Sequence, residues 1–438
     1  LTLVNGADGR ELKSKQLTLD ANKLFDAQTE IRQQVLDILG WKIPPTLNQQ
    51  FTAQKPAFDG AYKHYLQGQG YLYRFDHGDN INKALRAFQA AIALDPNYAD
   101  AYVGLAEAQL RSFIEFKDVN QLVAMANTVA KLRELDSDHA LLSYLEGELN
   151  LNQGNYEDAV ELFRKSTERI AKFLKAYIGL SNSFTQLGQS IKAEQVLLRA
   201  YELMPNNGLV LSNLGAFHYR NGNYNQAIKY FELLAQLAPN NHTAYLNISA
   251  CHYLNGNVEQ AIIFAEKSLD IKDNYVAYSN IGTSYFILQN YNKAIVAFEQ
   301  MIALNDNDYT NWGNLADAYR FANNSKYINA FNKAILLAEQ AIKLNPNNKY
   351  AAASLAYYYA NLGDIDKIHY YANQITEIDL GEDLFLIAAA YSSVHMNEAA
   401  IKYLEYAINN NYSIAEIINS PLFEGLRKET KFQQLVKM

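Results

Sequence analysis

The sequence predicts an all-α protein: a right-handed superhelix of stacked helix pairs (an α-solenoid) with a small truncated α/β remnant at its amino end. Its 438 residues exceed what one hydrophobic core usually holds, so the chain is either several domains or a repeat array. Apolar residues make up 49% of the chain and proline is scarce, at 8 residues, which favours long helices over a turn-rich sandwich. Similar residues also recur at a nearly constant spacing.

The spacing is seen by stepping along the middle of the chain. Met204–Asn207 returns 34 residues later as Ala238–Asn241. Tyr224–Ala227 has its equivalents at Val258–Ala261 and again at Tyr291–Ala294. A fixed period of this length is typical of a solenoid whose repeat is one pair of antiparallel helices.

Extending this register gives ten repeats, over about 61–98, 99–139, 140–173, 174–207, 208–241, 242–274, 275–308, 309–348, 349–380 and 381–414. The eighth position of each repeat carries a small residue: Gly68, Ala106, Gly147, Ser181, Gly215, Ser249, Gly282, Ala316, Ala356 and Ala388. The twentieth, or its equivalent, is mostly alanine: Ala84, Ala159, Ala193, Ala227, Ala261, Ala294, Ala334 and Ala400. Small residues at both points let paired helices approach closely. Met125 and Ile368 depart from the second rule, so we expect the second and ninth repeats to pack less regularly.

One segment carries a family pattern. Trp312–Tyr319 (WGNLADAY) resembles the first half of the tetratricopeptide repeat, W-x2-L-G-x2-Y, which A-x3-F then follows. The resemblance implies a superhelix whose concave face holds a segment of another protein. We therefore expect a non-catalytic protein-interaction module.

The two ends do not fit the repeat. Leu1–Val4 and Arg10–Leu17 predict a hairpin around the turn Asn5–Gly9, and Asp20 can cap a helix that runs to about Leu39. We assign 1–41 to the remnant of an α/β domain, 42–56 to a linker, 57–414 to the repeats and 415–438 to a capping helix that starts at Ser420-Pro421. Because the chain opens at Leu1, not Met, we expect it to be a fragment of a longer protein.

These ends resemble a bacterial family. Asp8-Gly9, Leu24-Phe25 and Glu30-Ile31 are similar to the end of a TolB-like or FlgO-like domain, Ala57–Gly68 to that family's entry into its first repeat, and Pro421–Phe423 to its closing segment. The resemblance implies the sensor or docking region of a transmembrane serine/threonine kinase, adenylyl cyclase or winged-helix regulator, lying outside the cytoplasm. The signalling domain is absent from this sequence, and a cytoplasmic location stays open.

No catalytic motif is found. The sequence contains no phosphate-binding loop, no H-E-x-x-H, no G-x-S-x-G and no kinase signature, so we expect no enzyme activity and no cofactor from this chain. The formal net charge is −8 and no long Lys/Arg run is present, which argues against nucleic acid. No apolar stretch reaches the roughly 18 residues that span a bilayer, so we expect no membrane insertion.

His218 and His252 occupy equivalent repeat positions, 34 residues apart, next to the single cysteine, Cys251. One interpretation is a metal site. We favour the other, in which both histidines replace a tyrosine in the helix packing, because a third ligand is missing.

The candidate site is a column of asparagines at the sixth repeat position, Asn213, Asn247, Asn280 and Asn314, which in tetratricopeptide proteins faces the groove. A side-chain amide both donates and accepts, so it can pair with the backbone of an extended peptide. A similar ladder lines the superhelix of protein O-GlcNAc transferases. The alternative is that asparagine is simply common at this position. Beside the column we assign to the groove Tyr219, Arg220, Tyr253, Phe286, Asp317 and Arg320.

Chaperone-binding tetratricopeptide domains hold a terminal carboxylate with lysine and arginine side chains. Here Asn182 and Asn213 fill the two asparagine places of that clamp, but Ile178, Thr243 and Asn247 stand where cations are needed. We therefore reject chaperone tails as ligands. The expected partner is a protein or extended peptide segment, and a homodimer, an envelope or secretion scaffold and a secreted effector that grips a host protein stay open.

Overall fold

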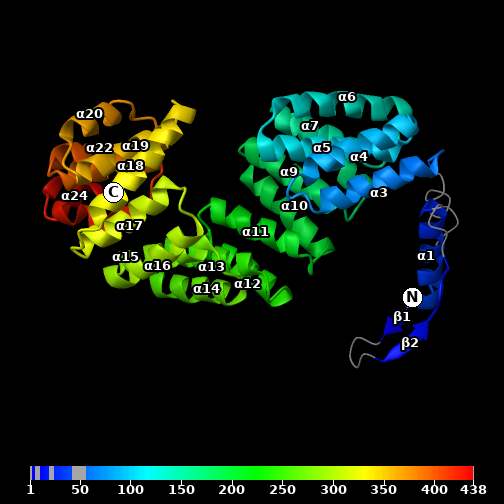
Figure 1. Cartoon of the computed structure of the whole chain (residues 1–438), viewed down its shortest axis with the longest axis horizontal. Coiled ribbons are helices and arrows are strands. Elements are labelled where there is room, and N and C mark those ends of the chain that lie inside the picture. The colour runs from blue at the N-terminus through cyan, green and yellow to red at the C-terminus, as the bar shows by residue number, and fades with distance from the viewer. Residues whose placement is uncertain (1, 5–9, 19–23, 42–55, 438) are drawn as a thin grey trace. The chain divides into compact units, whose positions relative to one another are not determined.

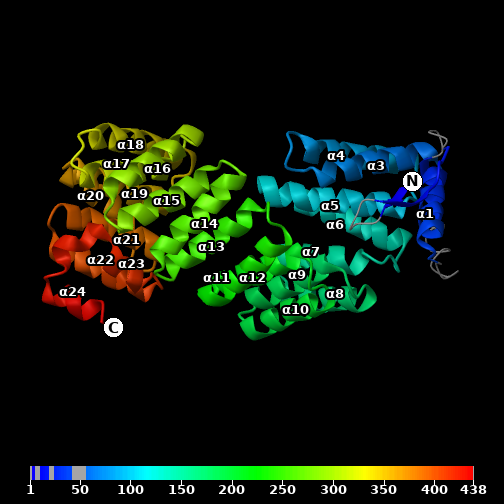
Figure 2. The ribbon, with the colours of Figure 1, turned by 90° about the horizontal axis from the view of Figure 1, so that it is seen from below.

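The computed structural model describes residues 2–4, 10–18, 24–41 and 56–437. The chain divides into two compact units, Leu1–Pro205 and Asn206–Met438. In both, consecutive helices lie side by side in pairs, as Figure 1 and Figure 2 show. The predicted all-α solenoid is confirmed within each unit.

The first unit begins with the predicted hairpin. Strand β1 (Thr2–Val4) pairs antiparallel with β2 (Glu11–Ser14), and helix α1 (Leu24–Leu39) follows. Phe25 on α1 is buried and meets Tyr62 edge to face, with ring centroids 5.1 Å apart. The predicted turn at 5–9, the capping Asp20 and the linker at 42–55 lie outside the described residues.

Four helix pairs complete the first unit: α3 (Asp59–Tyr73) with α4 (Asn80–Leu94), α5 (Ala99–Phe116) with α6 (Val119–Leu135), α7 (Leu142–Gln153) with α8 (Tyr156–Arg169), and α9 (Leu174–Gln186) with α10 (Ser190–Leu203). The second unit holds six pairs: α11 (Gly208–Arg220) with α12 (Tyr224–Leu237), α13 (His242–Leu254) with α14 (Val258–Ile271), α15 (Tyr275–Ile287) with α16 (Tyr291–Leu304), α17 (Tyr309–Phe321) with α18 (Tyr327–Leu344), α19 (Lys349–Asn361) with α20 (Ile365–Ala372), and α21 (Gly381–Ser393) with α22 (Asn397–Asn409). Each pair coincides with one predicted repeat.

The small residue at the eighth position is required by an aromatic ring on the second helix. A Cβ atom added at Gly215 would lie 2.5 Å from the Phe231 ring, and one added at Gly282 would lie 2.4 Å from Phe298. Both phenylalanines are almost fully buried. The two helices therefore touch at a point where only glycine fits, which is why the repeat pattern is so regular.

Where the eighth residue is serine, its hydroxyl joins the two helices instead. Ser181 donates to the carbonyl oxygen of Ala193 at 3.0 Å, and Ser249 donates to that of Ala261 at 2.7 Å. Both bonds run from the eighth to the twentieth position. The two predicted columns of small residues thus face each other across these two helix pairs.

Two details differ from the expected repeat. Met125 and Ile368, which replace alanine at the twentieth position, are fully buried, so their larger side chains are accommodated in the core. In the ninth repeat, the second helix, α20, has only 8 residues. Among the described residues, none of the helices combines the length and the apolar character needed to cross a membrane.

The expectation of a single capping helix after 415 is wrong. The segment forms α23 (Ile414–Asn419), a 3₁₀ helix η1 (Pro421–Leu426) and α24 (Thr430–Leu435). Pro421 has no N–H to continue α23, and the Ser420 hydroxyl accepts from the N–H of Leu422, which starts a new helix there. Phe423, Leu426 and Phe432 are buried, so the segment still covers the end of the core.

Candidate functional site

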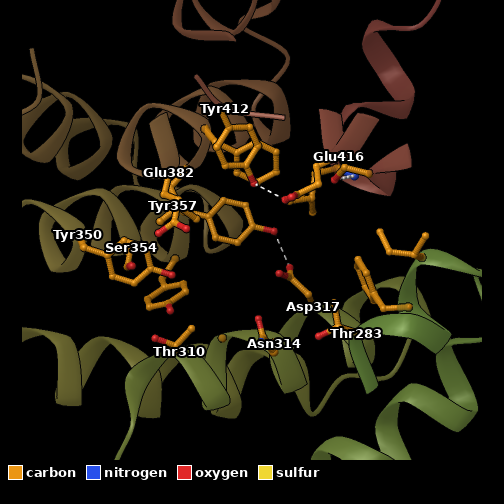
Figure 3. A pocket seen from close by; sticks show the side chains of 18 of the residues that line it. Thr283, Thr310, Asn314, Asp317, Tyr350, Ser354, Tyr357, Glu382, Tyr412 and Glu416 are labelled. Atoms are coloured by element: carbon orange, nitrogen blue, oxygen red, sulfur yellow. Dashed lines mark hydrogen bonds between the residues drawn. The ribbon is translucent and has the colours of Figure 1, made fainter. Parts of the chain in front are cut away.

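A cavity of about 320 Å³ lies in the second unit, among the first helices of consecutive repeats (Figure 3). Many of its wall residues, though not Phe286 or Phe385, occupy the second, sixth or ninth position of those repeats. They include Thr283 and Phe286 on α15, Thr310, Asn314 and Asp317 on α17, Tyr350, Ser354 and Tyr357 on α19, and Glu382 and Phe385 on α21. The repeat therefore places chemically different side chains around one cavity by using the same register positions.

The remaining wall comes from the end of the chain. Tyr412 stacks on Phe385, with ring centroids 4.7 Å apart, and its hydroxyl donates to Glu416 at 3.0 Å. Glu416 also faces Tyr253 of α13 across a smaller cavity. Helix α23 thus lies opposite α13, and residues far apart in the sequence share one site.

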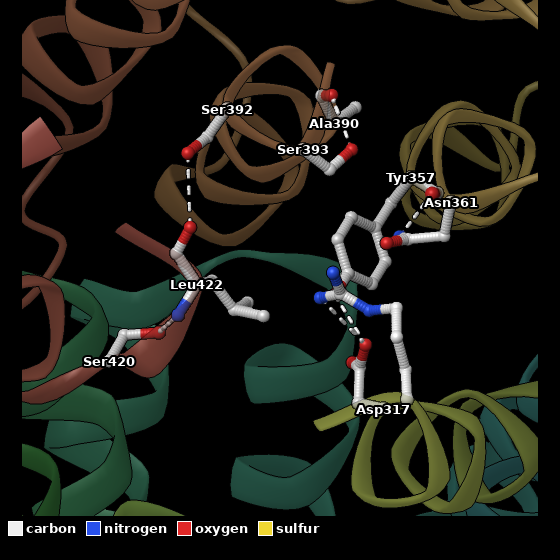
Figure 4. Close-up of polar contacts among 9 residues, drawn as sticks. Asp317, Tyr357, Asn361, Ala390, Ser392, Ser393, Ser420 and Leu422 are labelled. Atoms are coloured by element: carbon white, nitrogen blue, oxygen red, sulfur yellow. Dashed lines mark hydrogen bonds and ion pairs between the residues drawn. The ribbon is translucent and has the colours of Figure 1, made fainter. Parts of the chain in front are cut away.

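Hydrogen bonds fix this wall in place (Figure 4). Ser392 on α21 donates to the carbonyl oxygen of Leu422 at 3.0 Å. Leu422 and the buried Ser420 both line the cavity. The wall is therefore attached to the last repeat and is not a loose tail.

One carboxylate of the site is already paired. The Tyr357 hydroxyl donates to Asp317 at 2.6 Å, and the Arg320 guanidinium lies 3.6 Å from the same oxygen (Figure 4). Burial raises the pKa of Asp317 to about 6, although the Arg320 charge and the bond from Tyr357 act in the opposite direction. Asp317 and Arg320 thus form a largely buried polar pair under the cavity wall.

Two further carboxylates, Glu382 and Glu416, carry negative charge at the cavity. Burial raises the pKa of Glu416, the bond from Tyr412 lowers it, and the neighbouring Glu382 raises it again. No Lys, Arg or His is among the described residues that line this cavity. Its walls are therefore acidic and aromatic, with hydroxyl groups between.

Of the ten predicted groove residues, the structure places Tyr253, Phe286, Asn314 and Asp317 on this cavity. Arg320 lies behind it, with its guanidinium 4.5 Å from the Phe321 ring centroid. The residues that sequence reasoning missed fall into two groups. Tyr350, Ser354 and Tyr357 occupy the register positions of Thr310, Asn314 and Asp317 one repeat further on, and Glu382 takes the second position of the repeat after that. Tyr412 and Glu416 lie after α22, the last helix of the repeats, where no periodic signal marks them.

The asparagine column does not gather at one cavity. Asn247 lines a separate cavity of about 470 Å³ between α11 and α13. Asn213 donates to the carbonyl oxygen of Leu209 in its own helix, and Asn280 donates to the Ser249 hydroxyl at 3.4 Å. Only Asn314 lines the acidic and aromatic cavity.

Two other predicted groove residues, Tyr219 and Arg220, lie at the end of α11 and are exposed. The Tyr219 ring meets Tyr224 edge to face at 5.9 Å. Neither Tyr219 nor Arg220 is among the described residues that line the acidic and aromatic cavity.

Both histidines stack on aromatic rings in the helix packing. His218 lies parallel to Tyr230, with ring centroids 5.5 Å apart, and His252 lies at 5.3 Å from Phe264. Cys251 is fully buried. Among the described residues, no group of three or more His, Cys, Asp or Glu side chains could hold a metal ion. These contacts support the packing interpretation.

The equivalent face of the first unit has a different charge pattern. Lys175, at the second position of its repeat, lies 2.6 Å from Glu107 of α5 and 5.9 Å from the Tyr144 ring centroid. Burial raises the pKa of Glu148 to about 7, with the Lys175 charge opposing. Here the chain itself supplies the cation.

Comparison with protein families agrees with the fold. Models of the tetratricopeptide repeat match residues 208–274, 275–308, and 72–112 with 124–173. Together with the ten helix pairs, these matches identify the chain as a tetratricopeptide-repeat protein. Such repeats are protein-interaction modules and generally act as non-catalytic scaffolds.

Several solved structures are similar to parts of the chain. A tetratricopeptide repeat protein from Parabacteroides merdae is 15% identical, with a TM-score of 0.40 over 58% of this chain and 99% of that one. The Cut9 and Hcn1 hetero-tetramer of APC/C is 18% identical, with a TM-score of 0.42; the match covers 73% of this chain and 55% of that one. YrrB, described as having an unusual peptide-binding site, gives 25% identity and a TM-score of 0.31 over 44% and 97%. No curated protein sequence matches the chain.

Proposed function

We propose that the concave face of the second unit binds an extended segment of a partner protein, with the acidic and aromatic cavity at its centre. The observation that carries the proposal is the cavity itself, because successive repeats and the chain end all contribute side chains to it (Figure 3). Its volume of about 320 Å³ lies near the lower end of ligand pockets, about 300–1,000 Å³. It therefore has room for one or two side chains of a bound segment.

The chemistry of the walls suits a peptide. Phe385 and Tyr412 offer rigid aromatic surface, which dominates the binding energy of many protein interfaces. Asn314 carries an amide that can donate to and accept from a peptide backbone, and Thr283 and Thr310 add hydroxyl groups. A segment could thus be held by its backbone while one of its side chains enters the cavity.

Peptide display tests the proposal. The whole chain is used to select binders from a library of random twelve-residue peptides, and the selected peptides are measured against two variants. Thr283→Trp places an indole in the cavity wall, so we expect affinity to fall at least about tenfold. Val296→Trp adds the same group on α16, where Val296 is exposed and does not line the cavity, and should leave binding unchanged. A library without binders, or binders that ignore Thr283→Trp, would overturn the proposal.

The selected peptides also show which asparagines of the column contribute to binding. Asn314→Ala should weaken them more than the double change Asn247→Ala and Asn280→Ala, because only Asn314 lines this cavity. Helicity measured by circular dichroism should stay unchanged in both. The opposite ranking would move the binding surface to the cavity between α11 and α13.

We also propose that the chain is the docking region of a bacterial signalling protein. The hairpin β1–β2 and helix α1, which precede the repeats, support this, because they match the arrangement implied by the resemblance to TolB-like or FlgO-like domains. Reading the gene upstream of Leu1 tests it. A membrane helix preceded by a kinase, cyclase or winged-helix domain is expected, and an upstream region without any of these would contradict it.

A further inference from the structure

We propose that the cavity of the second unit selects a basic side chain, arginine above all, from the bound segment. The inference rests on the proposed function, since it names the chemistry of the residue that enters the cavity. It follows from the charges on the cavity wall, the position of the aromatic rings and one arginine of the chain itself.

The charge at the cavity is negative and not compensated. Asp317 is held by Arg320 and Tyr357, so its charge is already balanced. Glu382 and Glu416 have no such partner: among the described residues, no cation forms an ion pair with either. Glu416 accepts one bond from Tyr412, whereas an ionised carboxylate can accept about four. A cation entering the cavity would be attracted by both carboxylates.

The aromatic walls suit the same ligand. Tyr412 and Phe385 are stacked on one side, and Tyr350 and Tyr357 come from α19 (Figure 3). A cation within about 6 Å of a ring centroid is attracted to the ring, and the planar guanidinium also stacks on it. Acid and ring together therefore favour arginine over a neutral side chain of the same length.

The chain already contains an arginine in this kind of environment. The Arg320 guanidinium lies 3.6 Å from the Asp317 carboxylate and 4.5 Å from the Phe321 ring centroid. Glu416 and Tyr412 offer the same two groups to the cavity, without an arginine of the chain between them. The cavity therefore offers a ligand's arginine the same combination of a carboxylate and an aromatic ring that Arg320 contacts within the chain.

The same walls exclude acidic segments. A glutamate side chain or a terminal carboxylate in the cavity would meet Glu382 and Glu416 with no described cation on the wall to balance it. The selectivity is thus opposite in sign to that of the carboxylate clamp of chaperone-binding tetratricopeptide domains.

The test uses one selected peptide, or a Gly/Ser peptide of the same length, in versions that differ at a single central residue: arginine, lysine, citrulline or glutamate. Citrulline keeps the shape of arginine without its charge. Fluorescence anisotropy against the whole chain should give arginine at least about tenfold tighter binding than citrulline, with lysine between them and glutamate weakest. The arginine preference should shrink at high salt, where exposed charges are screened.

Two variants locate the effect. The double change Glu382→Gln and Glu416→Gln should reduce the arginine preference to about threefold or less while leaving the citrulline peptide unchanged. Glu405→Gln, an exposed carboxylate on α22 that does not line the cavity, is the matched control and should change nothing.

The outcomes separate the inference from the function. Equal binding of the four peptides, or a preference that survives the double change, would overturn the inference. If the four peptides bind equally but Thr283→Trp still weakens their binding, the proposed function stands and only the inference about charge fails. An arginine peptide that does not bind at millimolar concentration would overturn the inference as well.

Discussion

In the two units, the same register positions of the first helices carry side chains of different charge. In the first unit, the second position of a repeat holds Lys175, which lies between Glu107 and Tyr144. In the second unit, the corresponding positions around the cavity hold Thr310, Tyr350 and Glu382. A single register position thus decides whether an acidic and aromatic surface is neutralised by the chain or left for a ligand.

Beneath these faces the two units share one core. Phe163 packs against Gly147 in the first unit as Phe298 packs against Gly282 in the second, with contact distances of 2.9 Å and 2.4 Å from an added Cβ. Both rings are almost fully buried. The units therefore differ in surface chemistry and not in how their helices are held together.

The largest expected effect tests that shared core. Phe163→Ala and Phe298→Ala should each lower the free energy of unfolding by about 3–5 kcal/mol, because each empties a large buried site that glycine cannot refill. Urea titration gives the loss, and native-state hydrogen exchange shows which helices lose protection. The loss of protection should centre on α7–α9 in one case and α15–α17 in the other, since solenoid repeats are stabilised by their neighbours.

If one variant lowered the free energy of unfolding by less than about 1 kcal/mol, the cores of the two units would not be equivalent. Tyr224→Phe on α12 serves as control. It keeps the ring and removes only a partly exposed hydroxyl, so it should leave the unfolding curve nearly unchanged.

The fold could be predicted from the sequence because its period is a packing rule. Gly215 and Gly282 are glycine for a local reason, the ring on the partner helix, and that reason recurs in each repeat of this kind. The chain end was predicted less well. Ser420 followed by proline marks the start of a helix, and η1 begins there, but the short α23 before it and the break between η1 and α24 were not expected.

The site was harder to predict than the fold. Phe286, Asn314 and Asp317, which the sequence analysis assigned to the groove, line the candidate cavity, because groove positions follow the period. Tyr412 and Glu416 could not be found in this way, because their place depends on how the chain end folds back against α13, a long-range contact with no local signal. The asparagine column shows the converse, since a regular sequence pattern need not converge on one cavity.

A medium effect concerns the buried carboxylate of the first unit. Burial raises the pKa of Glu148 to about 7, from 4.5 in an unfolded chain. Between these values the folded state binds more protons, so stability should fall as the pH rises from about 4.5 to 7 and stay low above it. Glu148→Gln should therefore stabilise the chain by about 3 kcal/mol at pH 8 and hardly at all at pH 4.

Urea titrations at the two pH values measure this difference, with Glu168→Gln, an exposed carboxylate on α8, as the control. Equal stability of Glu148→Gln and the parent chain at pH 8 would show that Lys175 offsets the burial completely. That result would mean that the cation neutralises the acidic side chains of the first unit more fully than the distances indicate.

The smallest expected effect on stability comes from Lys175, the residue whose charge distinguishes the first unit from the second. Lys175→Met removes the cation between Glu107 and Tyr144 but keeps an unbranched apolar side chain. Because 58% of the Lys175 side chain is exposed, the unfolding free energy should fall by less than about 1 kcal/mol, and less still in 1 M salt. Yet the first unit would then present an acid beside a ring without Lys175, while the Arg111 charge still acts on Tyr144 and Glu148. The arginine peptide should gain a second, weak site that Glu107→Gln removes again. If no second site appears, the cavity walls, and not the uncompensated charge alone, make the second unit selective.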